Sequence, residues 1–116
     1  MRFILIPLLL ALLLGLPLGP ALAAEIVTVA ELLQQADAAW EKGSRAQAIA
    51  MCTQVIVADP KNLKALALRG RYHHELRQDV RAVADFDEVL KHDPKATVIF
   101  QLRGWSKFRL GKFYES

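Results

Sequence analysis

The chain contains 116 residues, of which 53% are hydrophobic, and its 15 lysines and arginines only slightly outnumber its 12 aspartates and glutamates. This length allows one small domain and excludes a multidomain enzyme. The single cysteine excludes an internal disulfide framework and a thiolate metal cage. The small excess of positive charge gives no indication of nucleic-acid binding.

The first 23 residues have the pattern of a secretory signal peptide. Arg2 provides a short basic end, residues 3–14 are apolar, and the Ala-Leu-Ala of residues 21–23 suits a signal peptidase. An uncleaved membrane anchor is the alternative, because a helix over this stretch would be just long enough to cross a bilayer. Glycines and prolines in its second half favour cleavage near Ala23. We therefore expect a mature domain of residues 24–116 that is periplasmic or secreted.

A sequence pattern recurs after 34 residues. The tripeptide Asp-Pro-Lys occupies residues 59–61 and again 93–95, and the dipeptide Arg-Gly occupies residues 69–70 and again 103–104. Several single residues also recur at this separation. So many coincidences at one separation indicate a repeated structural unit.

Each unit has the apolar spacing of two helices. In the first unit, the apolar residues between positions 32 and 40 fall on one face of a helix, and no part of the sequence has the period-two alternation of a strand. An Asp-Pro pair closes each unit, because the residue before a proline is disfavoured in a helix. We therefore expect an all-α fold of helical hairpins at about residues 29–62 and 63–96, with an incomplete unit at 97–116.

Short polar residues and a glycine are expected to mark the helix ends. Thr28 and Glu31 have the spacing of a capping box, in which each side chain accepts from the other residue's amide. Gly43 offers a left-handed helix stop. Asn62 and Asp79 can each cap the helix that follows.

The third unit contains one helix, expected from Thr97 to Leu110 and ending at Gly111. Its apolar residues surround the helix almost completely, and leaving large apolar side chains exposed forfeits about 1.5 to 3 kcal/mol for each. Three explanations remain open: a truncated reading of a longer repeat protein, an end that dimerises or is covered by a partner, and a marginally stable short protein. We expect the chain to self-associate through this end.

This pattern resembles the tetratricopeptide repeat family, whose 34-residue unit is a helix-turn-helix with small residues where the two helices touch. The matching residues of the first and second units are Leu32, Ala36, Ala48, Cys52, Pro60, Leu66, Gly70, Ala82, Phe86 and Pro94. The resemblance implies antiparallel repeats stacked as a short right-handed α-solenoid. Because Gly70 has no side chain, the helix that carries Ala82 and Phe86 can pack closely against it.

No group of residues indicates catalysis, a metal or a cofactor. Cys52 is expected in the core, because Phe86 occupies its place in the next unit. His73 and His74 diverge by about 100° around a helix and cannot hold one ion together. We expect His73 on the packing side and His74 toward the surface. There is no glycine-rich phosphate loop and no Gly-x-Ser-x-Gly nucleophile, so enzyme activity is not expected.

Positive charge is concentrated in two blocks. Residues 61–81 contain six basic and two acidic residues, and residues 95–116 contain five and one. The resemblance implies that the first helices of successive units line a concave groove for a partner segment. The expected partner-binding residues are Lys64, Arg71, His74, Gln101, Trp105 and Arg109, with the cations attracting acidic groups and Trp105 as an aromatic anchor.

Other residues are directed to the same groove by the resemblance. These are Leu33, Asp37, Trp40, Glu41, Ala67, Glu75 and Phe108. Leu33 and Asp37 replace the Lys and Asn of the family's chaperone-tail carboxylate clamp, so that specialised function is not expected.

The sequence therefore predicts a non-catalytic scaffold or adaptor whose partner is another protein or peptide, with acidic groups favouring binding. It predicts no nucleic-acid partner, and contact with a membrane only if the leader remains uncleaved. The alternative is a fragment or membrane-tethered piece of a larger repeat-containing assembly factor without an independent ligand.

Overall fold

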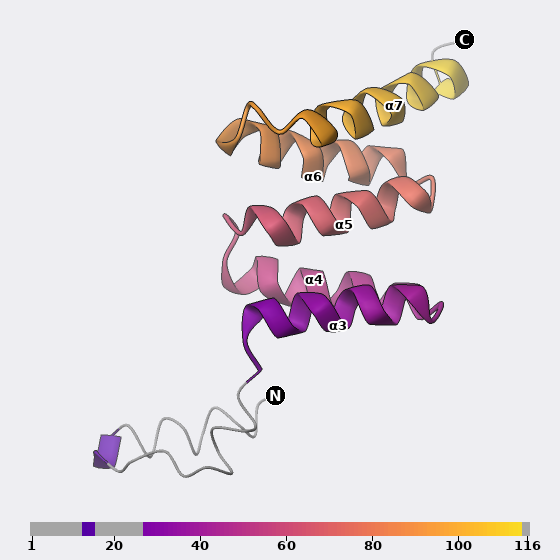
Figure 1. The fold of residues 1–116 in the computed structure, drawn as a ribbon. Helices are drawn as coiled ribbons and strands as arrows, with labels where there is room; N and C mark the ends of the chain where they lie inside the picture. The colour runs from indigo at the N-terminus through magenta and orange to yellow at the C-terminus, as the bar shows by residue number, and fades with distance from the viewer. Residues whose placement is uncertain (1–12, 16–26, 115–116) are drawn as a thin grey trace. The chain divides into compact units, whose positions relative to one another are not determined.

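The computed structural model describes residues 13–15 and 27–114. Between residues 27 and 114 the regular elements are five helices, with no strand: α3 (Val29–Glu41), α4 (Arg45–Ala58), α5 (Leu63–Glu75), α6 (Asp79–His92) and α7 (Thr97–Tyr114) (Figure 1). The prediction of an all-α fold is confirmed.

The predicted signal peptide lies almost wholly outside the described residues, which include only 13–15 of it. Cleavage near Ala23 and export therefore stay predictions. Within the described part of the chain, no helix is long and apolar enough to cross a membrane. The chain divides into two compact units, residues 1–31 and 32–116, and the packing described below is that of the second.

Three of the predicted helix-end signals are confirmed. The Glu31 amide donates to Thr28 Oγ1 at 3.2 Å, and the Thr28 amide donates to Glu31 Oε2 at 3.4 Å, which is the reciprocal pair of a capping box. Gly43 has a φ of 89°, a left-handed conformation that a residue with a Cβ rarely adopts. Asn62 Oδ1 accepts from the Ala65 amide at 3.0 Å at the start of α5.

Two predicted helix boundaries are wrong. Asp79 is the first residue of α6 rather than its cap, because its carboxylate turns away from the helix end and pairs with Arg109; Gln78 takes the cap position without a side-chain capping bond. Helix α7 continues through Gly111 to Tyr114. A glycine within a helix costs only about 1 kcal/mol relative to alanine, and this cost does not end α7.

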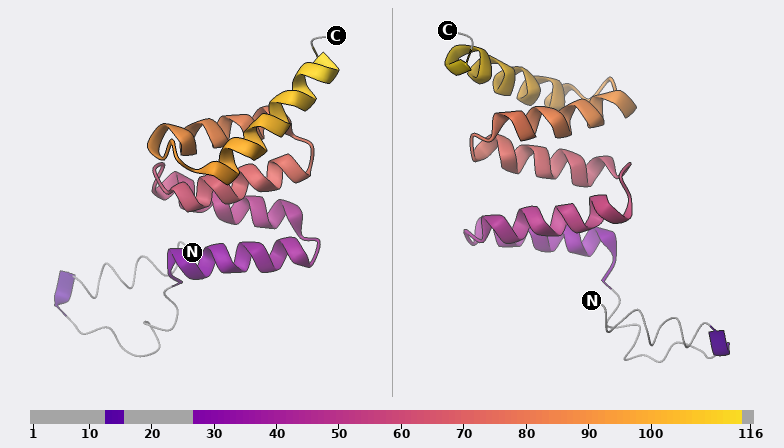
Figure 2. Two further views of the ribbon diagram at one scale, coloured as in Figure 1. Left: turned by 45° about the horizontal axis from the view of Figure 1, so that its top comes forward. Right: turned by 180° about the vertical axis from the view of Figure 1, so that it is seen from behind.

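Successive helices pack on one another in chain order. Helix α5 contacts α4 and α6, and α7 contacts both α6 and α5. The chain reverses direction at each loop, so neighbouring helices run antiparallel (Figure 1). The last turns of α7 extend past the ends of α5 and α6 in every view (Figures 1 and 2). Helix α7 therefore has contacts along only part of its length and surface.

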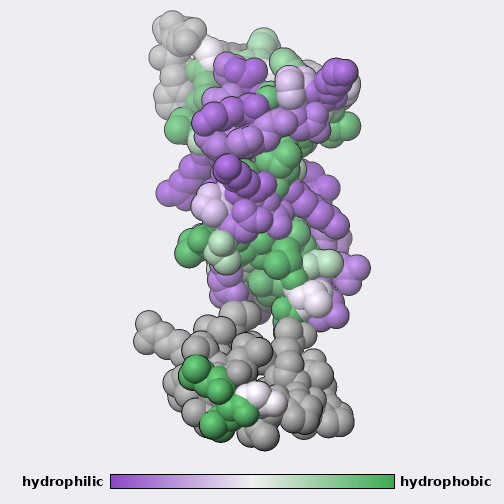
Figure 3. Space-filling view, turned by 90° about the vertical axis from the view of Figure 1, so that its left-hand side faces the viewer, coloured by the Kyte–Doolittle hydropathy of each residue, from purple (hydrophilic) through white to green (hydrophobic). Residues whose placement is uncertain are grey.

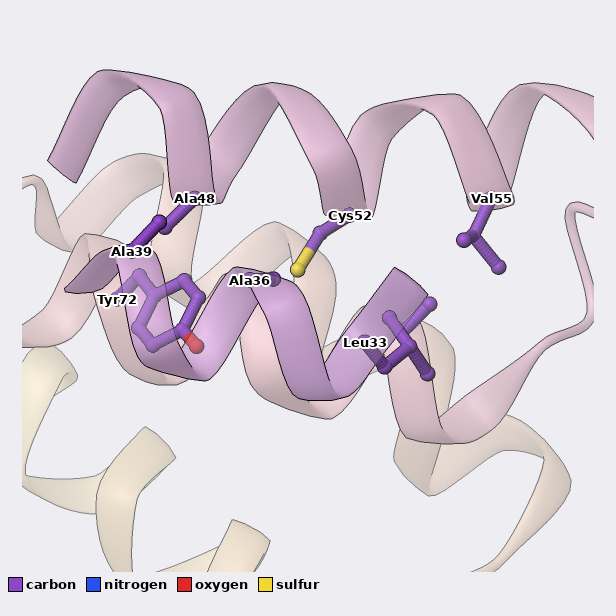
Figure 4. Close-up of a cluster of buried hydrophobic side chains, with 8 residues drawn as sticks. Leu33, Ala36, Ala39, Ala48, Cys52, Val55 and Tyr72 are labelled. Carbon is purple, nitrogen blue, oxygen red and sulfur yellow. The ribbon is translucent and has the colours of Figure 1, made fainter. Parts of the chain in front are cut away.

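Small residues form the core between α3, α4 and α5. Cys52 points from α4 toward Ala36 on α3, and Ala48 lies beside Ala39 (Figure 4). Ala36, Ala48 and Cys52 are not accessible to solvent. The whole cluster comprises Leu33, Ala36, Ala39, Ala48, Cys52, Val55, Ala65 and Tyr72. Burial raises the pKa of the Cys52 thiol to about 11, so the thiol stays protonated at neutral pH. The predicted place of Cys52 in the core is confirmed.

Helices α5 and α6 approach each other most closely at Gly70. A Cβ atom at this position would lie 2.6 Å from Phe86 Cε1 and 3.1 Å from Asp85 Cβ. The first distance is shorter than real Cβ contacts, so only glycine allows the Phe86 ring to sit where it does. The predicted contact with Phe86 is confirmed, and the second close neighbour of Gly70 is Asp85 rather than Ala82.

Polar side chains cover much of the surface around this core. Figure 3 shows the side of the molecule on which the α4–α5 and α6–α7 loops lie, and hydrophilic residues occupy most of its upper and middle parts. Hydrophobic residues are visible between them and over the lower helices. The charged residues of the candidate site must therefore be distinguished by their contacts and not by exposure alone.

Candidate partner-binding groove

A groove of about 320 Å³ crosses the face formed by α3, α5 and α7. These helices are the first helices of the two 34-residue units and of the incomplete third unit. The groove is lined by Leu33, Gln34, Asp37, Lys64, Ala67, Leu68, Arg71, Val98, Ile99 and Leu102. Its walls are therefore contributed by segments that lie far apart in the sequence.

The groove has an apolar floor and a charged rim. Leu33 is buried, and Leu68, Ile99 and Leu102 are half-buried, so part of their apolar surface remains available. On the rim, Arg71 Nη2 lies 3.1 Å from Asp37 Oδ1, with 46% and 53% of the two side chains exposed. An exposed ion pair contributes only about 0–1 kcal/mol, so a partner can exchange with it at low cost.

Lys64 is the second cation on the rim. It is exposed, and it forms no ion pair with any residue of the described segments. Its ammonium group can therefore approach an acidic group without first breaking a bond in the protein. Together with Arg71 it makes the α5 side of the groove positively charged.

A stacked pair of rings fixes the rim of the groove between α3 and α5. The Trp40 and Tyr72 ring centroids are 4.3 Å apart with the planes 9° from parallel, and Trp40 Nε1 donates to Glu75 Oε2 at 3.1 Å. The hydroxyl of the buried Tyr72 donates to Asp37 Oδ1. Burial and the Asp37 carboxylate both raise the pKa of Tyr72, so its hydroxyl remains a donor. Asp37 is thus held in place from α5.

The six predicted partner-binding residues lie in three different places. Lys64 and Arg71 line the groove. Gln101 and Trp105 line a separate hollow on the outer face of α7. His74 and Arg109 belong to an internal polar network that also includes Asp79 and Ser106.

Arg109 is the centre of this internal network. Its Nε donates to the two carboxylate oxygens of Asp79 at 3.1 and 3.0 Å, and its Nη2 donates to the backbone oxygen of His74 at 2.9 Å. Only 19% of the Arg109 side chain is exposed. Arg109 therefore attaches α7 to the α5–α6 hairpin, and it does not present its charge to the groove.

His74 lies inside the same network. Its Nδ1 is 2.9 Å from Arg109 Nη2 and 2.8 Å from Ser106 Oγ. A neutral ring with its proton on Nε2 can accept at Nδ1 from either group. Burial, followed by the charge of Arg109, lowers the pKa of His74. The expectation that His74 points toward the surface is wrong, whereas His73 is buried as expected.

The sequence missed the contribution of α7 to the groove. Val98, Ile99 and Leu102 line it, in place of the expected Gln101, Trp105 and Phe108. Val98 and Leu102 lie 34 residues after Lys64 and Leu68, which also line the groove. Gln101 and Trp105 lie 34 residues after Ala67 and Arg71 but line the separate hollow. In the other helices, Leu33, Asp37 and Ala67 line the groove as expected, whereas Trp40, Glu41 and Glu75 do not.

The geometry of the described residues is the guide to function, because comparisons of the chain with protein-family models, curated proteins and solved structures found no match. In the segments that the structure describes, no three His, Cys, Asp or Glu side chains come together as a metal site requires. The groove offers apolar contact and positive charge, and these properties suit binding of another molecule.

Proposed function

We propose that this chain is a tetratricopeptide-type adaptor that holds a segment of another protein in the groove across α3, α5 and α7. The observation that carries the proposal is that every residue lining the groove comes from the first helix of a 34-residue unit. In this proposal the antiparallel hairpins stack as a short right-handed α-solenoid, and the groove is its concave face. The adaptor catalyses nothing.

The floor and rim define the chemistry of the partner segment. An apolar side chain seated on Leu68 and Leu102 would gain about 1.5 to 3 kcal/mol from burial. Acidic groups beside it would meet Lys64 and Arg71, which steer the encounter and set the register. The proposed ligand is therefore an extended or helical peptide with an apolar anchor flanked by Asp or Glu.

A peptide selection against the full chain tests this function. We expect the selected peptides to contain an apolar anchor with acidic neighbours. We expect the double variant Lys64→Glu/Arg71→Glu to lower their affinity by about tenfold or more, measured by fluorescence anisotropy. The matched control is Arg81→Glu/Lys91→Glu, which reverses two exposed cations of α6 outside the groove. Equal affinity for the groove variant and the control would refute the groove as the binding site.

The alternative function is a fragment or membrane-tethered piece of a larger assembly factor without its own ligand. The exposed aromatic side chains of α7 favour it, because 62% of Trp105 and 60% of Phe108 are exposed within the described residues. It predicts that the peptide selection yields no peptide whose affinity depends on Lys64 and Arg71. It also predicts that the protein isolated from cells retains Met1, whereas export as a free adaptor predicts an N-terminus at Ala24, which N-terminal sequencing distinguishes.

A further inference from the structure

Two glycines 34 residues apart have opposite surroundings. Gly70 on α5 is covered by the ring of Phe86 from α6. At Gly104 on α7, a Cβ atom would have no described atom within 4 Å. The same backbone feature that receives a neighbouring helix on α5 is therefore open to solvent on α7.

The surface around Gly104 is a hollow with aromatic walls. It encloses about 390 Å³ and is lined by Gln101, Gly104, Trp105 and Phe108. The Trp105 and Phe108 rings meet edge to face, with their centroids 6.1 Å apart. Phe100 is also exposed one turn before Gly104, whereas its counterpart Leu66 on α5 is buried. The apolar surface that α5 uses to hold α6 is thus present but uncovered on α7.

The charge of α7 distinguishes between two kinds of occupant. Between Thr97 and Gly111 the helix carries Arg103, Lys107 and Arg109 and no acidic residue. A second copy of α7 lying against it would bring like charges together. Helix α6, which covers α5, is acidic instead, and its Asp85 binds Arg69 beside Gly70 with an Oδ1–Nη2 distance of 2.7 Å. Arg103, the counterpart of Arg69, already pairs with Asp87 of α6, with an Nε–Oδ1 distance of 2.6 Å. The exposed Lys107 is therefore the cation that α7 offers to an occupant, and its charge favours an acidic helix.

We propose that the outer face of α7 is a second docking surface, separate from the groove, and that it binds an acidic amphipathic helix of a partner protein. This helix packs on α7 as α6 packs on α5. It places an aromatic ring over Gly104, between Phe100 and Phe108, and its acidic residues lie toward Lys107. The partner is recognised by this pattern of a small residue, an acid and a phenylalanine within about two turns, as in Ala82, Asp85 and Phe86.

The sequence of α6 supplies the probe. A fluorescent peptide with the sequence of residues 78–94 is titrated into the full chain and followed by anisotropy. We expect saturable binding that weakens about tenfold or more when the phenylalanine of the peptide is replaced by alanine, or when its acidic residues at positions 85, 87 and 88 are replaced by lysine. Binding that is insensitive to both peptide changes overturns the proposal.

Variants of the protein locate the site. Gly104→Leu fills the hollow from a position with no neighbouring atom among the described residues, so the helix keeps its fold, which circular dichroism checks. We expect this variant and Trp105→Ala each to weaken the peptide about tenfold or more. The matched control is Val57→Ala, which changes an exposed apolar residue on α4. An unchanged affinity of Gly104→Leu, or equal losses in the control, overturns the proposal.

Two other occupants of the hollow would give different experimental results. Sedimentation that detects a dimer abolished by Trp105→Ala identifies a second copy of the chain as the occupant and overturns the proposal. Peptide binding that appears only after residues 1–23 are removed identifies the leader as the occupant and overturns it equally. A monomeric full chain whose peptide affinity depends on Gly104 and Trp105, but not on Lys64 and Arg71, supports the proposal independently of the groove.

Discussion

The two junctions between successive units of this chain are held together by different chemistry. At the first junction, between α3 and α5, the Trp40 ring stacks on Tyr72. At the second, between α7 and the α5–α6 hairpin, the Asp79 carboxylate holds Arg109. Stacked rings derive their stability from buried area and ring contact, whereas the carboxylate and guanidinium must both be ionised. The first junction therefore combines ring contact with a hydrogen bond and an exposed ion pair to Asp37, whereas the second depends on a largely buried charge pair.

This difference shows what a repeat period does and does not specify. The period of 34 residues places a helix at equivalent positions along the chain and a glycine on both α5 and α7. It does not specify the groups that join one unit to the next. Tyr72 and Ser106 are 34 residues apart and each contacts the first helix of the preceding unit, but one does so with a ring and a phenol and the other with a small hydroxyl. Variants at the two junctions test how differently ring contact and charge stabilise them.

Removing the buried ring of the first junction has the largest expected effect. Tyr72→Ala should lower the free energy of unfolding by about 3–5 kcal/mol, because it leaves a cavity and an unstacked Trp40. For a domain of this size, such a loss is a large part of the total. Urea denaturation followed by circular dichroism measures it. The control Tyr72→Phe keeps the stack and loses only the bond to Asp37, at about 0.5–1.5 kcal/mol; equal losses would show that the ring itself contributes little.

Neutralising the second junction comes next. Asp79→Asn should lower the free energy of unfolding by about 2 kcal/mol, because the half-buried Arg109 loses its charged partner. Hydrogen exchange should accelerate more in α7 than in α3. The matched control is Asp87→Asn on the same helix, which removes a half-exposed partner of Arg103 and should cost about 0–1 kcal/mol. If hydrogen exchange in α7 is equally slow in the two variants, Asp79 does not hold this helix in place and the interpretation is wrong.

Alanine at the two equivalent glycines should have effects of opposite sign. Gly70→Ala places a Cβ against the Phe86 ring and should destabilise the protein by about 1–3 kcal/mol. Gly104→Ala meets no described atom and should stabilise it by about 0.5–1 kcal/mol through its higher helix propensity. Thermal unfolding of the two variants in parallel gives the comparison. Destabilisation by Gly104→Ala would mean that its surroundings are filled in solution.

The smallest expected effect is a dependence of the second junction on pH. The folded-state pKa of His74 lies below its unfolded value of about 6.5, because of burial and Arg109. Well above pH 6.5 the folded and unfolded states are both neutral at His74, and its full contribution to stability is present. As the pH falls below about 6.5, the unfolded state gains a proton that the folded state does not, so stability decreases until the folded-state pKa is reached.

The charged groups around His74 determine how this is measured. Arg109, Asp79, Glu75 and Arg77 all act on the pKa of its ring, so the variant His74→Gln is compared with the parent by urea denaturation between pH 5 and 7. We expect the variant to show a shallower loss of stability on acidification. Parallel curves for the two proteins would assign the pH dependence to other groups.

Local features of the fold were predictable from the sequence, whereas the attachment of the last helix was not. The caps at Thr28 and Asn62 and the turn at Gly43 each depend on a few adjacent residues, and the approach of Phe86 to Gly70 follows from a missing side chain. The orientation of α7 depends on bonds between residues more than 30 positions apart, such as the pair of His74 and Ser106. No local periodicity carries that information.

The candidate site was likewise predictable only in part. Lys64 and Arg71 were placed correctly, because α5 keeps the orientation that the repeat implies. Gln101, Trp105 and Arg109 were assigned to the same groove because their counterparts on α5 were expected there. The pairing of Asp79 with Arg109 draws Arg109 into an internal network, and Gln101 and Trp105 line the outer hollow instead.

The core also provides a means of observing the molecule as it opens. Cys52 is the one thiol of the whole sequence, it is sealed between α3 and α4, and its pKa of about 11 leaves almost no thiolate at neutral pH. An alkylating reagent can therefore react only after these helices part. The rate of labelling gives the frequency of that event in the unaltered protein, without any introduced dye or tag, and in an oxidising environment the same seal keeps two molecules from becoming cross-linked.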